Sequence, residues 1–587
     1  MNFDKFKELS FGTSGLRDTV ENMTDMECYI NTRGFLSYMQ ETGDFSEGSA
    51  VVLGGDRRPS TVRIKSAVAA AIRDMKGRVD EQGLVSTPAL TYYAMGEKRP
   101  SVMVTGSHIP ADRNGIKFTK RAGEVLKSDE PGILRNVSKE REKIYSLSGK
   151  TFLFDEKGMF KPDEAKKALA LLKEKEYSGP AVKQYTERYK NVFGGDALKD
   201  KIFFYQHSAV ARDFGRKIFE DLGSEVISPA EKMTVEYTDE SGGEKSEQTA
   251  LRSELFIPVD TESVSNLTMA IFKRVMNEHN VDIGVTMDGD SDRPLLVYRV
   301  FKNGKPTDAV NYITGDILGL LSVLGLKQAG VDINAVAVPI SANDAIDKVL
   351  SEMGIEITKT KIGSPYVIAA MTESRRKHLK SGGQWNVFSW ESNGGFLTGN
   401  DLDISGKTLK ALPSRDAVLP LISVLLLSLN KGKKVSELID ELPARYTHAD
   451  RKKNFPSDKS RAVIKSISPE KEKDVKEVFF NKSDAVITSF NGSSKPLSGD
   501  NEFFSVKRRL ETFFTKENGF SDIIRINYID GVRIFFSNGD ISHLRPSGNA
   551  PEFRNYAIAS TPKRAKEIVQ LGLESIIPGL SKEAGSE

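Results

Sequence analysis

The chain has 587 residues, 39% of them hydrophobic and 28% charged, a composition typical of a protein with several cores of domain size. Its 84 basic and 81 acidic residues leave a formal net charge of +3, which argues against a nucleic-acid partner and favours a small molecule. The longest apolar stretch, residues 417–429, is shorter than the ~20 residues that a transmembrane helix needs. It predicts a buried helix and no membrane partner.

The first third of the chain alternates apolar runs with helical periodicity. Residues 50–53 predict a strand, and the apolar spacing over residues 59–77 predicts a helix. A second helix begins at residues 87–88, and a strand over residues 101–104 ends just before Ser107. Because ligands collect at the carboxyl ends of strands in open α/β sheets, Ser107 is predicted to lie at a ligand site.

The middle of the chain repeats this alternation. A predicted helix at residues 266–279 precedes a buried strand at 281–287, and three aspartates follow the strand at once. A further strand, helix and strand are predicted at residues 335–338, 346–353 and 355–358. Three successive α/β segments are the simplest account of this pattern.

The last part of the chain is rich in β-branched and aromatic residues over 523–544. The dipeptides Asp530-Gly531 and Asn538-Gly539 predict hairpins within it, and a terminal helix is predicted from about Pro562. These signals indicate a smaller α+β domain. Two polar stretches, residues 231–250 and 450–482, are predicted to be mobile or inserted.

The compartment is indicated by two features. The single cysteine, Cys28, can form no internal disulfide, and the first residues carry no apolar secretion signal. Both observations predict a cytoplasmic protein.

Asp288, Asp290 and Asp292 alternate with small residues, so that one loop can aim three carboxylates at a single point. Hard cations such as Mg²⁺ require that arrangement, whereas the alternative is a solvated acidic turn. A calcium EF-hand is excluded, because Arg293 stands at loop position six and Arg299 at position twelve. Arg293 instead suggests an anionic substrate beside the ion.

Ser107 offers a hydroxyl nucleophile, and it matches neither a Walker loop nor a Gly-x-Ser-x-Gly elbow. Lys117 follows ten residues later. A lysine held near a cation and Arg17 can be driven toward its neutral form and accept a proton. For the adjacent His108, the alternative to a catalytic role is a structural hydrogen bond.

Two further segments suit a sugar phosphate. Glu391 is followed by Gly394 and Gly395, which permit a sugar to approach closely. The Glu391 carboxylate can accept hydrogen bonds from the hydroxyl groups of that sugar. A Pro/Gly turn near the end of the chain combines guanidinium groups with small donors suited to phosphate, and the alternative is a basic surface turn. Its residues are Arg545, Ser547, Gly548, Asn549 and Arg554.

With these residues in view, the chain resembles the α-D-phosphohexomutases, the superfamily of phosphoglucomutase and phosphomannomutase. The resemblance covers nearly the whole chain, and its segments stand in the family order. They are residues 11–17, 55–60, 105–110, 288–293, 391–395 and 545–554.

The resemblance implies an α/β fold of three α/β sandwich-like domains with mixed sheets and a C-terminal α+β domain of strand hairpins and helix, arranged around a central cleft. The expected domains carry the phosphoserine loop, the metal loop, the sugar loop and the phosphate-binding loop. Their expected bounds are 1–193, 194–302, 303–440 and 441–587. A monomer or homodimer is expected.

The implied reaction is reversible phosphoryl transfer between a hexose 1-phosphate and a hexose 6-phosphate through a hexose 1,6-bisphosphate. Ser107 would carry the phosphoryl group and Lys117 would exchange the proton, with His108 and Arg17 also catalytic. Mg²⁺ would be held by Asp288, Asp290, Asp292 and Ser107. The implied substrate-binding residues are Arg293, Lys361, Glu391, Asn393, Arg545, Ser547, Gly548, Asn549 and Arg554.

The sequence departs from the family pattern at the sugar and phosphate loops. Asn393 stands where serine is usual, Asn549 and Ala550 replace threonine and glutamate, and Ser364 stands where some bacterial members carry histidine. The preferred sugar, mannose or glucose, therefore stays open. The alternatives are a phosphoglucosamine or N-acetylglucosamine-phosphate mutase, and a non-catalytic relative that binds sugar phosphates.

Overall fold

The computed structural model describes residues 3, 5–12, 15–172, 179–379, 385–470, 472–481, 484–499, 501–547 and 551–585. The chain forms two compact units. Unit 1 comprises Met1–Ala337 and Gly363–Ile439, and unit 2 comprises Val338–Ile362 and Asp440–Glu587. The finer division into four domains, with the bounds given above, stays a prediction.

The first sheet of unit 1 has the order β1-β5-β4-β2-β3, with β6 beside β5. β2 runs parallel to β3 and β4, whereas β5 is antiparallel to its neighbours. The strands are β1 (Gly15–Thr19), β2 (Ala50–Gly55), β3 (Arg78–Leu84), β4 (Ser101–Val104), β5 (Arg113–Lys120) and β6 (Gly123–Glu124). The predicted strands at residues 50–53 and 101–104 are confirmed as β2 and β4.

Helices pack around this sheet, and their ends follow the local sequence. Ser86 caps α3 by accepting a hydrogen bond from the Ala89 N–H, and Pro88 occupies the first turn, where its missing N–H costs nothing. The predicted helix at residues 59–77 is confirmed as α2. The helices are α1 (Asp25–Glu41), α2 (Thr61–Asp74), α3 (Thr87–Gly96), α4 (Glu130–Tyr145) and α5 (Pro162–Leu169).

The second sheet of unit 1 has the order β13-β12-β11-β7-β8, and β11 is parallel to β7 but antiparallel to β12. Its strands are β7 (Lys201–Phe204), β8 (Glu225–Ile227), β11 (Ile283–Met287), β12 (Pro294–Lys302) and β13 (Lys305–Tyr312). The helices of this region are α6 (Pro180–Phe193), α7 (Arg212–Asp221) and α8 (Asn266–Glu278). The predicted helix and strand before the three aspartates are confirmed.

The polar stretch at residues 231–250 is a regular hairpin. β9 (Lys232–Thr238) pairs antiparallel with β10 (Glu244–Ala250), and β9 packs against α8. Its strands hydrogen-bond to each other, so the segment satisfies its backbone with few buried side chains. Of the two alternatives given for this stretch, mobile or inserted, the ordered two-stranded ribbon agrees with the second.

A third sheet of unit 1 contains β16 (Val387–Trp390), β17 (Phe396–Thr398) and β20 (Leu412–Asp416), with β16 parallel to the first residues of β14 (Ala335–Pro339). A small ribbon joins β18 (Leu402–Ile404) to β19 (Lys407–Leu409). The helices are α9 (Gly315–Gln328), α11 (Ser364–Leu379) and α12 (Val418–Lys431), followed by α13 (Val435–Asp440). These mixed sheets confirm the α/β class.

The apolar stretch at residues 417–429 forms α12, and it is buried, as predicted. Gly325 of α9 allows the two helices to touch, because a Cβ there would lie 2.2 Å from the Ser423 carbonyl oxygen. Within the described ranges, no helix combines the length and the apolar character that crossing a bilayer requires.

Unit 2 is built on an eight-stranded sheet with the order β21-β28-β27-β26-β25-β22-β23-β24, in which every neighbouring pair is antiparallel. The strands are β21 (Tyr446–Lys452), β22 (Val475–Asn481), β23 (Asp484–Ser489), β24 (Ser494–Ser498), β25 (Ile523–Asn527), β26 (Val532–Phe536), β27 (Ile541–Pro546) and β28 (Phe553–Ala559). The hairpins predicted at Asp530-Gly531 and Asn538-Gly539 are confirmed.

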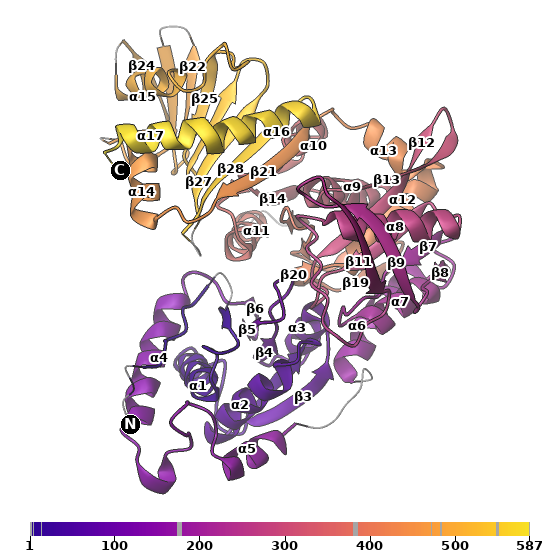
Figure 1. Ribbon diagram of the computed structural model, residues 1–587, viewed down its shortest axis with the longest axis vertical. Coiled ribbons are helices and arrows are strands. Elements are labelled where there is room, and N and C mark those ends of the chain that lie inside the picture. The colour runs from indigo at the N-terminus through magenta and orange to yellow at the C-terminus, as the bar shows by residue number, and fades with distance from the viewer. Residues whose placement is uncertain are drawn as a thin grey trace. The chain divides into compact units, whose positions relative to one another are not determined.

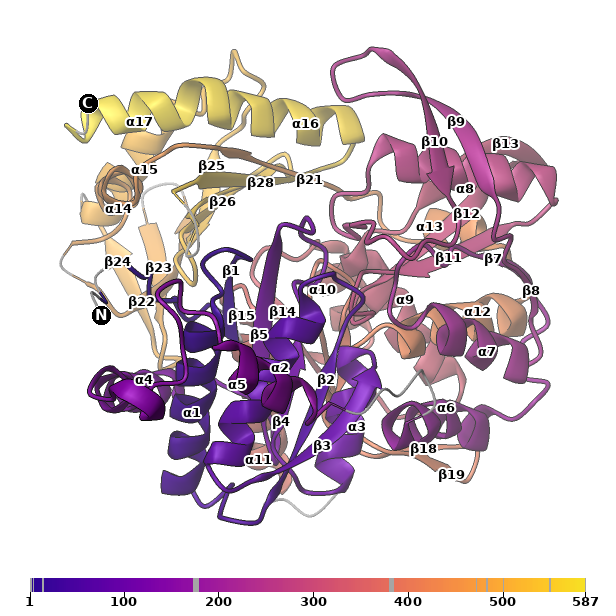
Figure 2. The same cartoon turned by 60° about the horizontal axis from the view of Figure 1, so that its bottom comes forward.

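Helices cover this sheet, and Figure 1 and Figure 2 show α16 and α17 lying across it. Their apolar residues join those of the strands in one core, which includes Ile568, Leu580, Ile534 and Leu544. The stretch 450–482, expected to be mobile or inserted, contributes part of β21, all of α14 and β22. The helices and remaining strand are α10 (Ala345–Glu352), β15 (Glu356–Thr360), α14 (Ser457–Ser466), α15 (Glu502–Glu511), α16 (Pro562–Leu571) and α17 (Ile577–Glu583).

His543 of β27 makes the stability of unit 2 depend on pH. The ring is buried, its Nε2 lies 2.6 Å from the Asp530 carbonyl oxygen, and burial followed by the charge of Arg533 lowers the pKa of His543 to about 3. An unfolded histidine titrates near 6.5, so between the two values the unfolded state binds more protons. This contribution is complete above pH 6.5 and is lost as the pH falls toward 3.

We expect the free energy of unfolding to fall by about 2 kcal/mol from this residue alone between pH 7 and pH 5. His543→Gln can keep the hydrogen bond but does not titrate, so its loss over the same interval should be smaller by that amount. Urea unfolding at the two pH values measures the difference. His279→Gln, at an exposed position after α8, is the control, and equal losses in wild type and His543→Gln would contradict the prediction.

Candidate active site

The acidic loop lies between β11 and β12 and is tightly curled. Asp288 Oδ1 accepts hydrogen bonds from the N–H groups of Asp292 (3.1 Å) and Arg293 (3.2 Å), and Ser291 has a left-handed φ of 57°. The curl brings together one oxygen from each of Asp288, Asp290 and Asp292, and these atoms lie within 4.8 Å of one another. All three side chains are buried.

The free oxygens of this loop fit a hard cation. Asp290 Oδ1 and Asp292 Oδ1 are buried and have no hydrogen-bond partner among the residues that the structure describes. Buried carboxylate oxygens are costly without a partner, and anionic oxygens are the ligands that Mg²⁺ and Ca²⁺ take. The three aspartates could therefore hold a divalent cation.

The protonation of the loop reflects crowding of like charge. Burial, together with repulsion from Asp290 and Asp292, raises the pKa of Asp288 well above its usual value. Burial alone would also raise the pKa of Asp290, but Lys117 and Thr87 hold the pKa of that carboxyl below its usual value. A cation bound among the three would relieve the repulsion at Asp288.

Ser107 faces this loop from the end of β4. Its Oγ donates a hydrogen bond to Asp288 Oδ2 at 2.5 Å, and its N–H donates to Thr105 Oγ1 at 2.8 Å. The residue has a left-handed φ of 57°, which is uncommon for serine and is often seen at functional turns. Only glycine fits at position 289, because a Cβ there would lie 2.5 Å from the Ser107 carbonyl oxygen.

The side chain of Arg58 stabilises the Ser107 loop through hydrogen bonds to its main chain. Its guanidinium donates to the carbonyl oxygens of residues 107, 109, 110 and 113 at 2.5 to 2.9 Å, and it pairs with Asp56 at 3.2 Å. Asp56 in turn accepts hydrogen bonds from Thr61 and Thr105. One buried arginine thus satisfies four carbonyls and fixes the shape of the loop.

Lys117 of β5 reaches the same carboxylates. Its Nζ lies 2.5 Å from Asp290 Oδ2 and 2.8 Å from Asp292 Oδ2. Thr87, the first residue of α3, donates from Oγ1 to Asp290 Oδ2 at 2.5 Å and from its N–H to the Asp290 carbonyl oxygen at 3.0 Å. The structure therefore brings Lys117 to the acidic loop and supplies Thr87 as a partner that no sequence motif indicated.

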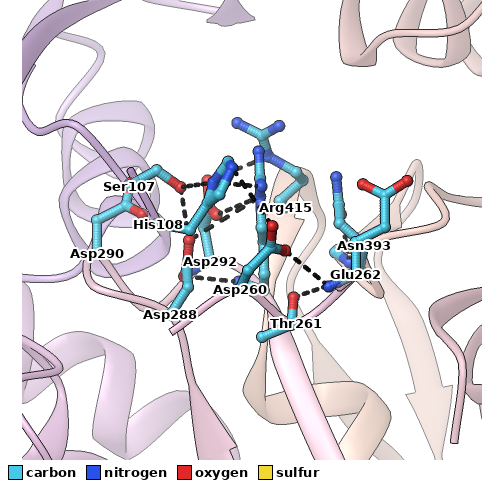
Figure 3. Close-up of polar contacts among 12 residues, drawn as sticks. Ser107, His108, Asp260, Thr261, Glu262, Asp288, Asp290, Asp292, Asn393 and Arg415 are labelled. Atoms are coloured by element: carbon cyan, nitrogen blue, oxygen red, sulfur yellow. Dashed lines mark hydrogen bonds and ion pairs between the residues drawn. The ribbon is translucent and has the colours of Figure 1, made fainter. Parts of the chain in front are cut away.

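His108 follows Ser107 directly, and its ring lies near the acidic loop (Figure 3). Arg293 Nη1 donates to His108 Nδ1 at 2.7 Å, and the same ring nitrogen lies 3.5 Å from Ser107 Oγ. Burial, followed by the charges of Arg293 and Arg17, lowers the pKa of His108 to about 2, so the ring is neutral. Arg17 is an exposed residue of β1 that lies within electrostatic range of Asp290 and Arg293.

The sugar-loop residues Glu391 and Asn393 are buried and follow β16. Arg415 of β20 joins them to the acidic loop, because its Nε donates to Asp292 Oδ2 at 3.1 Å and its Nη1 donates to Glu391 Oε2 at 3.2 Å. Figure 3 shows this guanidinium between the two loops. Sequence reasoning missed Arg415, which lies 123 residues from Asp292 in the chain and belongs to no recognised motif.

Unit 2 carries the candidate phosphate-binding residues. Arg545 and Arg554 stand opposite each other on β27 and β28, so their side chains leave the same face of the sheet. Arg545 Nε donates to Asp530 Oδ2 at 2.7 Å, and the N–H of Ile362, the residue after Lys361, donates to the same oxygen at 3.0 Å. Lys361 is exposed and belongs to unit 2.

Ser547 follows β27, and its N–H donates to the Glu552 carbonyl oxygen at 2.9 Å. The predicted residues Gly548 and Asn549 lie outside the described residues. Arg451 of β21 stands opposite Arg554 and adds a third guanidinium to this row of strands, which sequence reasoning also missed. The row could bind a phosphate through forked hydrogen bonds.

The chain is similar to known proteins over most of its length. Residues 8–144 match the phosphoglucomutase/phosphomannomutase alpha/beta/alpha domain I, and residues 314–446 match domain III of the same proteins. The chain is 33% identical to a phosphomannomutase of Salmonella muenchen over 571 residues, which cover 97% of this chain and 95% of that protein.

A phosphomannomutase of Sinorhizobium fredii is 30% identical over 564 residues, covering 96% of this chain and 98% of that protein. Among solved structures, a phosphoglucomutase/phosphomannomutase family protein from Burkholderia thailandensis superimposes with a TM-score of 0.59 at 16% identity. That match covers 98% of this chain and 97% of the other and shows a shared fold.

Proposed function

This chain belongs to the phosphoglucomutase/phosphomannomutase family of α-D-phosphohexomutases and is an enzyme, a hexose phosphate mutase, and we propose that Ser107 is the residue that carries its phosphoryl group. The observation that supports this role is the 2.5 Å hydrogen bond from Ser107 Oγ to Asp288, at the edge of a buried trio of carboxylates. Nucleophile and candidate metal loop thus meet at one point.

The proposed substrates are mannose and glucose phosphates. In the first half-reaction the phosphoryl group leaves Ser107 Oγ as a hydroxyl of the bound hexose monophosphate forms the new P–O bond, which yields a hexose 1,6-bisphosphate. In the second, after the bisphosphate turns over, Ser107 Oγ attacks its other phosphate and releases the isomeric monophosphate. The phosphoserine is regenerated, so the cycle balances without water.

Protons and charge are handled by residues beside the nucleophile. Lys117 would accept the proton of the attacking hydroxyl, and return it in the reverse step, once Mg²⁺ has replaced its ammonium beside the carboxylates of Asp290 and Asp292, which otherwise favour the charged form. Mg²⁺ held by Asp288, Asp290 and Asp292, with Ser107 at its edge, would neutralise charge on the transferring phosphoryl group. Arg293, oriented through His108, would neutralise further charge, and Arg17 is proposed to help.

Binding of the sugar and of the non-reacting phosphate is proposed for separate groups. Glu391 would accept hydrogen bonds from sugar hydroxyls, with Arg415 fixing its carboxylate, and Asn393 would supply an amide contact. The anion site of unit 2 is proposed to grip the non-reacting phosphate. Its residues are Lys361, Arg545, Ser547, Gly548, Asn549 and Arg554.

Two measurements test this proposal. The purified enzyme with Mg²⁺ should convert mannose 1-phosphate or glucose 1-phosphate to the 6-phosphate in a coupled assay, faster than glucosamine 1-phosphate or N-acetylglucosamine 1-phosphate. Intact mass should show a fraction of the protein carrying one added phosphate, located at Ser107. Faster turnover of an amino sugar would assign the alternative substrate, and a phosphate located at another residue would reject Ser107 as the carrier.

A further inference from the structure

A turn at residues 260–262 lies beside the site without belonging to any of its recognised loops (Figure 3). It connects the β9–β10 hairpin region to α8. Asp260 Oδ1 accepts hydrogen bonds from the N–H groups of Glu262 (2.9 Å) and Ser263 (3.2 Å), so one carboxylate oxygen shapes the turn. The other oxygen, Oδ2, accepts neither of these hydrogen bonds and lies on the side of His108.

The hydrogen bond from Arg293 fixes which nitrogen of the His108 ring carries the hydrogen. A guanidinium can only donate, so the 2.7 Å bond from Arg293 requires His108 Nδ1 to be the acceptor. The neutral ring then carries its hydrogen on Nε2, and Asp260 Oδ2 lies 4.0 Å from that nitrogen. That separation is within ion-pair range but too long for a hydrogen bond, so the carboxylate faces the Nε2–H and attracts it through its charge. Arg293 thus contacts Nδ1 of the His108 ring, and Asp260 faces Nε2 of the same ring.

The turn also holds the sugar loop. Thr261 is buried, with 2% of its surface exposed, and its Oγ1 donates to the Asn393 carbonyl oxygen at 3.0 Å. Asn393 uses its own side-chain oxygen to accept from the Gly395 N–H at 3.0 Å, which shapes the loop further along. The main chain of Asn393 is therefore fixed by a residue 132 positions earlier in the sequence.

We propose that residues 260–262 form a positioning turn, in which Asp260 sets the ring of His108 beside Ser107 and Thr261 sets the sugar loop at Asn393. This inference rests on the proposed function, because it assigns the turn to the same site. Neither residue is proposed to touch the reacting atoms. Their effects should differ: Asp260 acts on the phosphoryl-transfer side and Thr261 on the sugar-binding side.

Asp260→Asn tests the first contact. The amide oxygen can keep the two turn hydrogen bonds, which leaves an N–H₂ group facing the Nε2–H of His108, so that two donors oppose each other. We expect kcat to fall about tenfold with KM for the hexose phosphate nearly unchanged, because the ring is misplaced while sugar contacts remain. In a His108→Ala background the same substitution should have almost no further effect.

Thr261→Val tests the second contact, since valine keeps the shape but cannot donate to Asn393. Loss of one hydrogen bond predicts a rise in KM of about three- to tenfold with a smaller change in kcat. Thr261→Ser restores the donor and should restore KM. A turn that is merely structural would move the unfolding temperature and both kinetic constants together, in Thr261→Val and Asp260→Asn alike.

Asp239→Asn is the matched control, because Asp239 also shapes a turn, at the tip of the β9–β10 hairpin, through hydrogen bonds to residues 241 and 243. It should leave kcat and KM unchanged. Two outcomes would overturn this inference and leave the proposed function standing, provided that the wild type turns over normally. In one, Asp260→Asn has the kcat and KM of the wild type; in the other, it lowers kcat equally with and without the His108→Ala substitution. A wild-type protein that turns over no hexose phosphate would instead overturn the proposed function.

Discussion

Ser107→Ala is expected to lower mutase turnover by roughly 10³-fold or more, because the substitution removes the hydroxyl proposed to carry the phosphoryl group. Ser107 Oγ is the hydroxyl that donates to Asp288, at the acidic loop. The coupled assay with hexose 1-phosphate measures the loss, and intact mass should show that the added phosphate has disappeared. Near wild-type turnover in this variant would contradict the role of Ser107.

A second variant separates chemistry from folding. Ser107 has a φ of 57°, which glycine adopts without strain, so Ser107→Gly should be at least as stable as Ser107→Ala and equally inactive. Ser423→Ala is the matched control. That serine is also buried, but its hydroxyl bonds the Leu419 carbonyl oxygen inside α12, and activity should persist there.

Asp290→Asn is expected to weaken Mg²⁺ binding roughly 100-fold and to lower turnover at fixed Mg²⁺ by a similar factor. The substitution removes one of three negative charges and leaves an amide where Lys117 and Thr87 now donate to Asp290 Oδ2. Part of the turnover should return at high Mg²⁺, because the other two aspartates remain. Calorimetric titration with Mg²⁺ and the dependence of kcat on Mg²⁺ measure the two effects.

The control for this variant is Asp282→Asn, just before β11, where the carboxylate pairs with Lys434 and Arg299 instead of the acidic loop. It should bind Mg²⁺ as the wild type does. Unchanged Mg²⁺ affinity in Asp290→Asn would remove Asp290 from the metal site.

The sequence indicated the parts of the site that are local in the chain. Asp288 and Ser107 each follow a short buried strand, and that pattern alone placed both at the ends of β11 and β4. The pairing of Arg415 with Asp292 depends on how separate sheets pack, and neither residue type nor spacing reveals it. Asp260 and Thr261 were missed for the same reason.

The polar stretch at residues 231–250 could not be decided from sequence for a different physical reason. Residues 231–250 bury little apolar surface, which is the usual sign of a mobile segment. Their strands nevertheless pair with each other and rest on α8, so that hydrogen bonding and one contact face replace a core. Composition reports the missing core but not the partner strand, and although Gly242-Gly243 is a hairpin signal between β9 and β10, the sequence of β10 is almost entirely polar.

The hydrogen bonds from Arg58 keep the Ser107 loop in one shape whether or not a sugar is bound. Four carbonyls and a left-handed serine are locked by a side chain that folds with the protein, so the entropy of shaping the carrier is lost at folding and not at each arrival of sugar. A phosphoserine on so preorganised a loop would stay in its reactive position between one catalytic cycle and the next.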